Sequence, residues 1–153
     1  MRIENPQLHL FKLKFKSDES QNNKEDWVNC GFHIGLKAEL IFELISIEKR
    51  WQIAKALNPI APYDYLIYLD DQWRTVQVKT IYNRRTKNGY EKIGRLYHGS
   101  KRSNYTPERR YKEGDFDLLF TTDGNQHWLI PYYLINNMWT LTLDSPKYIG
   151  FEI

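Results

Sequence analysis

The sequence predicts an α/β domain, and three observations lead to this fold class. The stretch from about residue 35 to residue 50 repeats its hydrophobic residues at the spacing of a helix. Several shorter stretches are rich in β-branched and aromatic residues and are bounded by turn residues, which is typical of strands. The chain has 153 residues, a length that favours one domain with a hydrophobic core of its own.

The composition excludes several kinds of protein. Cys30 is the only cysteine, so no internal disulfide forms, and the four scattered histidines give no Cys/His metal cluster. No glycine-rich phosphate-binding loop of the P-loop type occurs. No hydrophobic run approaches the roughly 20 residues that cross a bilayer. These features predict a soluble protein of the cytoplasm without a membrane partner.

The N-terminal residues alternate like a strand. In residues 7–16, Phe11, Leu13 and Phe15 fall on one side and lysines fall on the other. This pattern predicts a half-buried strand with a basic outer face. The extension formed by residues 1–33 can be an added strand or an oligomer contact.

The predicted helix carries glutamates beside its hydrophobic side chains. Glu39 and Glu43 are four residues apart and therefore share one face. Both can be ordinary solvated residues, or they can face a site. The hydrophobic residues that recur at helical spacing are Leu36, Leu40, Ile41, Leu44, Ile45 and Ile47.

A strand, a rigid loop and a hairpin follow the helix. Residues 51–57 read as a short strand, and two prolines in residues 58–62 hold the following chain rigidly. Residues 65–69 and 73–80 are rich in strand-forming residues and flank a polar turn at residues 70–72. This arrangement predicts a β-hairpin.

The hairpin holds polar residues that stability alone does not explain in a core strand. Asp64 stands at the start of the first strand. Gln77 and Lys79 are two residues apart and point to one face of the second strand, whereas Val78 points to the other. Unpaired polar groups in such a strand cost roughly a few kcal/mol each, so the set indicates function. Structural roles stay open: Asp64 as a turn residue, Lys79 as its ion-pair partner, and Gln77 as a partner of the backbone.

The C-terminal half predicts further strands. The second hairpin strand can continue to residue 85, and the Asn-Gly pair at residues 88–89 predicts a turn into a strand at residues 90–97. The remaining predicted elements are strands at residues 115–121 and 127–130, a short helix at residues 132–137, and a tail at residues 136–153 that forms a final strand or a dimer contact.

Positive charge is concentrated in one segment. Residues 84–112 carry a net charge of +8, and because the whole chain is +3, the remainder is −5. This asymmetry suggests a polyanionic partner such as nucleic acid, and five tyrosines in or beside the segment fit such a surface. A solvated loop is the alternative interpretation of this segment. Residues 98–112 are expected to form a polar, basic loop, and loops of that length are usually functional or disordered. The candidate contacts are Arg84, Arg85, Lys87, Arg95, Lys101, Arg102, Arg109 and Arg110.

The motif Pro62-x-Asp64 followed by Gln77-x-Lys79 resembles the signature of PD-(D/E)XK nucleases, with glutamine in the usual acidic position. Together with the preceding Gly-Leu-Lys-Ala-Glu of residues 35–39, the set is most similar to the small homing endonucleases encoded in group I introns. The resemblance implies a restriction-endonuclease-like mixed central β-sheet flanked by helices. It also implies a single endonuclease domain whose core spans residues 34–135.

The resemblance further implies the chemistry. The expected catalytic residues are Glu39, Asp64, Gln77 and Lys79, with Glu39 chosen over the neighbouring glutamate because it fits the family's G-x-x-A-E pattern. Mg²⁺, or Mn²⁺ in its place, is expected to be held by Asp64, Glu39, the Gln77 amide and the Val78 carbonyl. Lys79 is expected beside the attacking water.

The implied function is site-specific hydrolysis of double-stranded DNA by a homodimer or homotetramer, as in homing. Two other readings remain. One is an enzyme of the same fold with another target, such as a Holliday-junction resolvase or a restriction enzyme. The other is a DNA-binding module that has lost its catalytic activity.

Overall fold

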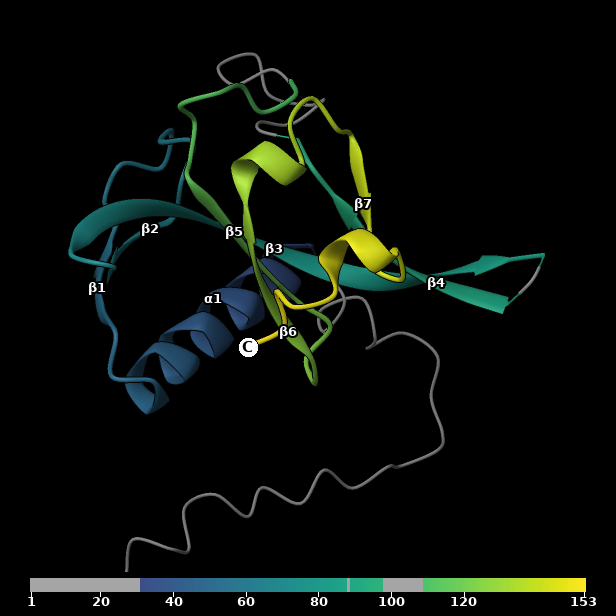
Figure 1. The fold of residues 1–153 in the computed structure, drawn as a ribbon, viewed down its shortest axis with the longest axis horizontal. Helices are drawn as coiled ribbons and strands as arrows, with labels where there is room; N and C mark the ends of the chain where they lie inside the picture. Colours follow the sequence, from purple (N-terminus) through teal and green to yellow (C-terminus); the bar gives the residue numbers. More distant parts are fainter. Residues whose placement is uncertain (1–30, 88, 98–108) are drawn as a thin grey trace, which may run out of the picture.

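The computed structural model describes residues 31–87, 89–97 and 109–153 (Figure 1). The predicted strand at residues 7–16, most of the basic loop, and Lys101 and Arg102 lie outside these residues. The elements in chain order are α1 (Gly31–Glu48), β1 (Gln52–Lys55), β2 (Tyr65–Leu69), β3 (Gln72–Thr86), β4 (Gly89–Arg95), β5 (Leu118–Thr122), β6 (His127–Pro131), the 3-10 helix η2 (Tyr132–Leu134), β7 (Thr140–Thr142) and the 3-10 helix η3 (Pro146–Tyr148).

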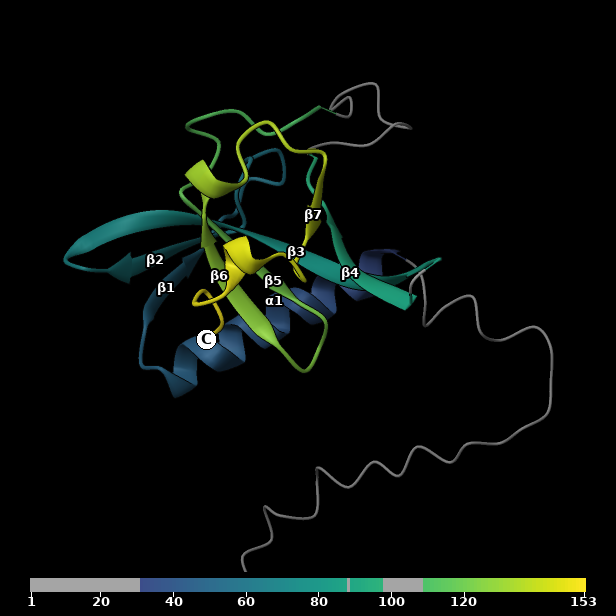
Figure 2. The same ribbon diagram turned by 45° about the vertical axis from the view of Figure 1, so that its right-hand side comes forward.

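Strand β3 is the centre of the sheet. It pairs antiparallel with β2 and β4 and parallel with β5, while β1, β7 and β6 continue the sheet from those three strands. Helix α1 packs on one face of the sheet, and the 3-10 helices lie on the other (Figures 1 and 2). The predicted α/β fold with a mixed central sheet is therefore confirmed.

The turn between β2 and β3 has two residues. Leu69 pairs directly with Gln72, so Asp70 and Asp71 alone make the turn, with φ values of 49° and 61°. Two positive φ values are typical of the type I′ turn, whose twist matches that of the strands it joins, and aspartate tolerates them better than most residues. The sequence placed Gln72 in the turn, whereas it is the first residue of β3.

The outer end of β3 and the start of β4 form an arm, residues 82–87 and 89–92, that projects from the body of the sheet (Figure 1). Thr86 pairs with Gly89, whose φ of 131° is disfavoured for residues with a side chain. Most of the arm is exposed, in contrast to Ile81 and Ile93 at its base. The predicted second hairpin is thus present, and β3 extends one residue further than expected.

Helix α1 buries a different stripe from the predicted one. Its buried hydrophobic side chains are Ala38, Phe42 and Ile45, and the Phe42 ring lies 5.0 Å from those of Tyr65 and Phe120. The expectation failed because α1 is hydrophobic on two opposite sides, so spacing alone does not show which side meets the sheet. Four of the expected residues are exposed: Leu36, Leu40, Leu44 and Ile47.

The tail supplies part of the core on the other face. Strand β7 pairs with β4, and Leu141, Leu143 and Tyr148 are buried against residues of β5 and β6, so the strand alternative describes this segment. The predicted helix at residues 132–137 is only the 3-10 turn η2, because the chain leaves the helical conformation at Ile135, whose φ is −123°. Among the described residues, no helix has both the length and the hydrophobicity to cross a bilayer.

The strand predicted at residues 51–57 is shorter in the structure. Strand β1 ends at Lys55, and one further hydrogen bond runs from the Ala56 N–H to the Asp64 carbonyl at 2.8 Å. The chain then enters the proline-containing loop, where Asn58 accepts a bond from the Ile60 N–H at 3.1 Å. This loop delivers Asp64 to the start of β2.

Candidate active site

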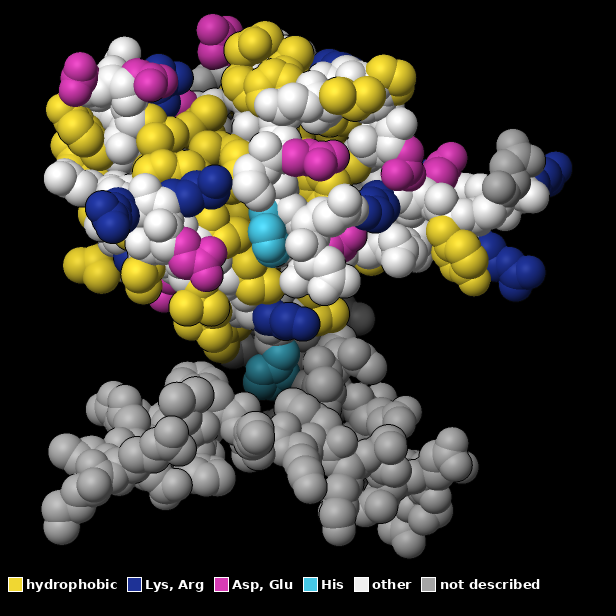
Figure 3. All heavy atoms as spheres, turned by 60° about the horizontal axis from the view of Figure 1, so that its bottom comes forward, with side chains coloured by type: hydrophobic (Ala, Val, Ile, Leu, Met, Phe, Trp, Pro, Cys, Tyr) yellow, Lys and Arg dark blue, Asp and Glu magenta, His cyan; other side chains and the backbone are white. Residues whose placement is uncertain are grey.

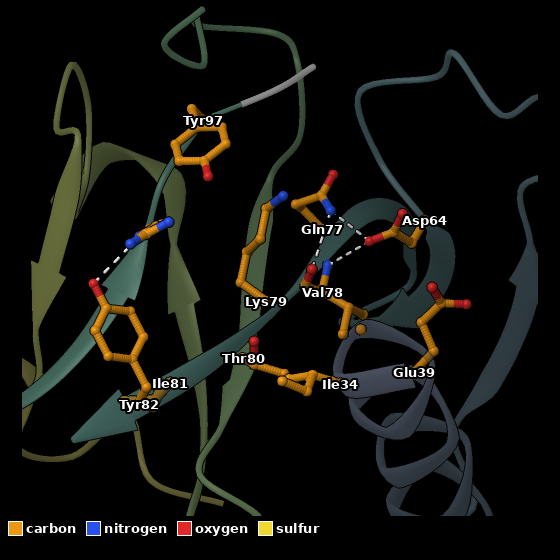
Figure 4. A pocket seen from close by; sticks show the side chains of 12 residues that line it. Ile34, Glu39, Asp64, Gln77, Val78, Lys79, Thr80, Ile81, Tyr82 and Tyr97 are labelled. Carbon is orange, nitrogen blue, oxygen red and sulfur yellow. Dashed lines mark hydrogen bonds between the residues drawn. The ribbon is translucent and has the colours of Figure 1, made fainter. Parts of the chain in front are cut away.

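The polar pair on β3 points into a pocket. Gln77 and Lys79 lie on one side of the strand, whereas Val76 and Val78 pack toward α1 on the other, as the alternation predicts (Figure 4). The pocket has a volume of about 630 Å³. Its lining residues are Ile34, Gly35, Glu39, Asp64, Gln77, Val78, Lys79, Thr80, Ile81, Tyr82, Arg95 and Tyr97.

Asp64 is held in place by its backbone and by its side chain. Its N–H donates to the Val76 carbonyl at 2.8 Å, which anchors it beside β3. Its Oδ2 accepts from Gln77 Nε2 at 2.5 Å and from the Val78 N–H at 2.8 Å. Burial raises the pKa of Asp64, although the Val78 N–H and the positive charge of Lys79 act in the opposite direction. The carboxylate is thus fixed with one oxygen engaged by the protein.

Lys79 lines the same pocket as Asp64 and Glu39. Burial lowers the pKa of Lys79, and the attraction of Asp64 opposes this only in part. Its Nζ lies 5.4 Å from the centre of the Tyr111 ring. The side chain can therefore change between ammonium and neutral amine more readily than a solvated lysine.

Glu39 reaches the pocket from α1. Figure 4 shows its side chain on the same side of the pocket as Asp64. Its Oε2 lies 2.9 Å from Nζ of Lys55, a residue of β1. Glu43, the alternative glutamate, instead accepts a hydrogen bond from the Tyr65 hydroxyl at 2.6 Å and does not line this pocket.

The donor set fits a hard divalent cation. Among the described residues, no group of three or more His, Cys, Asp and Glu side chains converges. Mg²⁺ needs only one or two protein carboxylates when phosphate and water complete its coordination, and Glu39 and Asp64 can provide them. The amide oxygen of Gln77 points away from Asp64 (Figure 4), while its Nε2 also donates to the Val78 carbonyl at 3.1 Å. Ligation by the Gln77 oxygen therefore needs a rotation of the amide.

The predicted cationic contacts are distributed over the arm and the pocket rim. Arg85 and Lys87 are exposed on the arm, and Arg84 pairs with Glu91 at 3.0 Å. Figure 3 shows Lys and Arg side chains at the outer end of the arm, on the right of the view. Arg95 lines the pocket, where its Nε donates to the Tyr82 hydroxyl at 3.3 Å.

Two further predicted contacts bind the protein itself. Arg109 forms two hydrogen bonds with Asp115, at 2.5 and 3.2 Å, and it is half-buried. Arg110 donates to the Asn137 carbonyl at 3.2 Å and lies 5.0 Å from the centre of the Trp139 ring. Arg109 therefore has a structural partner in addition to any role at the surface.

Sequence reasoning missed several residues around the site. Lys55 showed no signal, because its short strand does not alternate and its contacts with α1 exist only in three dimensions. In the sequence we could identify three further residues only as aromatics near cations: Tyr82, Tyr97 and Tyr111. Their spacing in the chain could not show that the first two line the pocket and that the third covers Lys79.

Comparison with known proteins identifies the fold. A solved structure of a bacterial homing endonuclease, I-Ssp6803I, matches with a TM-score of 0.64 and 17% sequence identity, covering 80% of this chain and 88% of that chain. No protein-family model and no curated protein sequence matches this chain. The chain thus has a fold similar to that of a homing endonuclease.

Proposed function

We propose that this chain is a metal-dependent DNA endonuclease of the PD-(D/E)XK type that makes site-specific double-strand breaks, as homing endonucleases do. One observation carries the proposal. A carboxylate at the start of β2 is hydrogen-bonded to an amide of β3, and a lysine two residues further along β3 lines the same pocket. The similarity in fold to a homing endonuclease supports it.

Mg²⁺ or Mn²⁺ would be held by Asp64 and Glu39, together with the carbonyl of Val78 and the amide oxygen of Gln77. When bound, the cation supplies charge neutralisation at the scissile phosphate and lowers the pKa of a water molecule. Gln77 replaces an acid with a neutral amide, so it adds no charge. Without the cation, its hydrogen bond to Asp64 fixes the orientation of that carboxylate. Rotation of the amide to bind the cation through oxygen would give up this hydrogen bond.

Lys79 is the residue that acts on the reacting groups. As an ammonium it donates a hydrogen bond to a phosphate oxygen and stabilises the negative charge that develops there. As a neutral amine it accepts a proton from the attacking water. Burial lowers the pKa of Lys79, which favours the neutral amine more than in a solvated lysine and supports the second step.

The arm and the pocket rim would bind the DNA. Exposed Arg85 and Lys87 suit phosphate contacts, and Arg95 extends the positive charge to the pocket that holds Lys79. Arginine can also read guanine in the major groove. The basic residues Lys101 and Arg102 remain candidates from the sequence alone.

One pocket of this kind cuts one strand, so a double-strand break requires two copies. A symmetric dimer, or a tetramer built from two dimers, supplies them and fits a long, roughly palindromic site. Light scattering of the purified chain with and without duplex DNA tests this part of the proposal, which predicts at least a dimer in the complex.

The activity is tested with a library of duplexes that contain a randomised region of about the length of two major-groove half-sites. The chain is incubated with Mg²⁺ or with EDTA, and the newly formed ends are sequenced. The proposal predicts Mg²⁺-dependent ends at one related set of sequences. Cleavage at branch points only, tested with a four-way junction, supports a resolvase instead. DNA binding without ends under any condition supports an inactive module.

A further inference from the structure

Lys55 stands between Glu39 and Glu43 of α1. Its Nζ lies 2.9 Å from Oε2 of Glu39 and 3.4 Å from Oε1 of Glu43. The same ammonium lies 5.2 Å from the centre of the Tyr65 ring, and the Tyr65 hydroxyl donates to Glu43 at 2.6 Å. The position of Lys55 is therefore fixed by its ion pairs with Glu39 and Glu43 and by its contact with the Tyr65 ring, which is itself hydrogen-bonded to Glu43.

The backbone places this lysine one strand away from the site. Lys55 is the direct partner of Tyr65 in the pairing of β1 with β2, and Tyr65 follows Asp64. The Ala56 N–H then donates to the Asp64 carbonyl at 2.8 Å. Burial raises the pKa of Asp64, and the positive charge of Lys55 acts in the opposite direction. A change at Lys55 thus acts on both carboxylates of the pocket.

We propose that Lys55 is a positioning residue that serves as an internal counter-cation of Glu39, and that it thereby weakens the binding of divalent cations by the DNA-free protein. The inference rests on the proposed function, because it concerns the cation that the endonuclease would use. It assigns a role to a residue that neither touches the substrate nor lines the pocket.

The charge balance leads to this role. Glu39 and Asp64 line the pocket together with the cations Lys79 and Arg95. Beside it, Lys55 pairs with Glu39 and Glu43. With both lysines protonated, little net negative charge remains to attract a divalent cation. A DNA phosphate brings the missing negative charge, so uptake of the cation is tied to binding of DNA. Removal of the Lys55 charge would loosen that coupling.

The test compares two lysine variants of the full chain. Lys55→Met removes the charge but keeps most of the hydrophobic stem. The matched control is Lys49→Met, which makes the same chemical change at a lysine that lies 5.7 Å from the centre of the Trp51 ring. Lys49 follows the last residue of α1 and is ten residues beyond Glu39. This corresponds to about 15 Å along the helix axis, which is beyond the screening length at physiological salt.

The readout is Mn²⁺ binding without DNA, followed by the electron paramagnetic resonance signal of the free ion. We expect Lys55→Met to bind Mn²⁺ roughly tenfold more tightly than the unchanged protein, the effect of one nearby charge at intermediate screening. Lys49→Met should stay within about twofold of the unchanged protein, since its charge is screened from the pocket. Loss of a merely structural contact would not tighten binding.

The proposal is overturned if Lys55→Met binds Mn²⁺ with the same affinity as the unchanged protein, or more weakly. Weaker binding would mean that Lys55 orients Glu39 as a ligand instead of competing with the cation. If Lys55→Met does not fold, as judged by circular dichroism, Lys55→Gln is measured under the same criteria.

Asp64→Asn separates this inference from the proposed function. If the unchanged protein and Lys55→Met bind Mn²⁺ and Asp64→Asn does not, the site is a cation site and the comparison of lysine variants decides the inference alone. If neither the unchanged protein nor Lys55→Met binds Mn²⁺ more tightly than Asp64→Asn does, with or without duplex DNA, the metal-dependent function fails. The inference then fails with it.

Discussion

The two halves of strand β3 differ in burial, charge and partners. Residues 72–80 pair with β2 and β5, and they carry Gln77 and Lys79 on one face and buried valines on the other. Residues 82–86 pair with β4 alone and are largely exposed and cationic. One continuous strand therefore joins a buried chemical site to an exposed arm.

The difference shows how the fold can separate chemistry from recognition. Six residues of strand separate Lys79 from Arg85, which corresponds to about 20 Å. That length equals about six base pairs of DNA at 3.4 Å each. Within our proposal, the arm contacts DNA about half a helical turn from the bond that is cut. Substitutions in one half should therefore change catalysis and stability, and substitutions in the other should change binding.

The largest effect is expected for Lys79→Met in the inner half. We expect the single-turnover cleavage rate to fall by about 10³-fold, because the group that stabilises charge at the phosphate is lost. The melting temperature should rise by about 2–4 °C, or about 1 kcal/mol, since burial already disfavours the ammonium. Quench-flow cleavage and differential scanning calorimetry measure the two changes. A variant that cuts normally, or that is less stable than the unchanged protein, would contradict this assignment.

Stability should depend on the inner half and hardly at all on the arm. Val76 is fully buried beneath α1, so Val76→Ala should cost about 2–3 kcal/mol of unfolding free energy. Asn83→Ala on the exposed arm should cost less than about 0.5 kcal/mol. Urea denaturation of both variants tests the contrast. Equal losses of unfolding free energy in the two variants would show that both halves of β3 contribute equally to stability.

Binding should depend on the arm. The double change Arg85→Ala and Lys87→Ala should weaken DNA binding by about tenfold at moderate salt and reduce the slope of log K against log salt by about 2. The cleavage rate at saturating protein should remain within about twofold, because both residues lie far from the pocket. Fluorescence anisotropy at several salt concentrations measures the slope. An unchanged slope would remove the arm from the DNA interface.

The smallest expected effect is a pH dependence of the stability difference between Lys79→Met and the unchanged protein. The pKa of Lys79 is lowered in the folded protein, so its destabilising charge is fully present below that pKa. As the pH rises from the folded pKa to the unfolded value of about 10.5, the unfolded chain holds more protons and the unchanged protein gains relative stability. The difference should therefore shrink as the pH rises from the folded pKa toward about 10.5. A difference that grows would mean that the pKa is raised.

The sequence predicted β3 and its polar pair because alternation along a strand is a local property. Gln77 and Lys79 fell on one face, and the family motif added Asp64 and Glu39, all four of which line one pocket. The counter-ion Lys55 could not be found in this way. Its partners lie on another strand and on α1, and only the packing of the helix on the sheet brings them together.

Helix α1 shows what periodicity in the sequence cannot predict. Its existence was predicted from periodicity, but Leu40 and Leu44 were expected to be buried and are exposed, whereas Phe42 fills the core. When a helix is hydrophobic on two sides, its sequence does not show which side is buried, because this depends on how the helix packs on the sheet. The length of the turn between β2 and β3 was also not predicted from the sequence. Because Leu69 pairs with Gln72, only Asp70 and Asp71 form the turn.

The most direct test of the central claim compares two identical substitutions on the same hairpin. Asp64→Asn changes the carboxylate at the pocket, and Asp71→Asn changes one in the exposed turn, where asparagine tolerates the positive φ of 61°. On the site identified from the duplex library, single-turnover cleavage by Asp64→Asn should fall by about 10³-fold while DNA binding stays within about threefold. Asp71→Asn should cut like the unchanged protein. Cleavage by Asp64→Asn within about tenfold of the unchanged protein would contradict the claim that this carboxylate organises the active site.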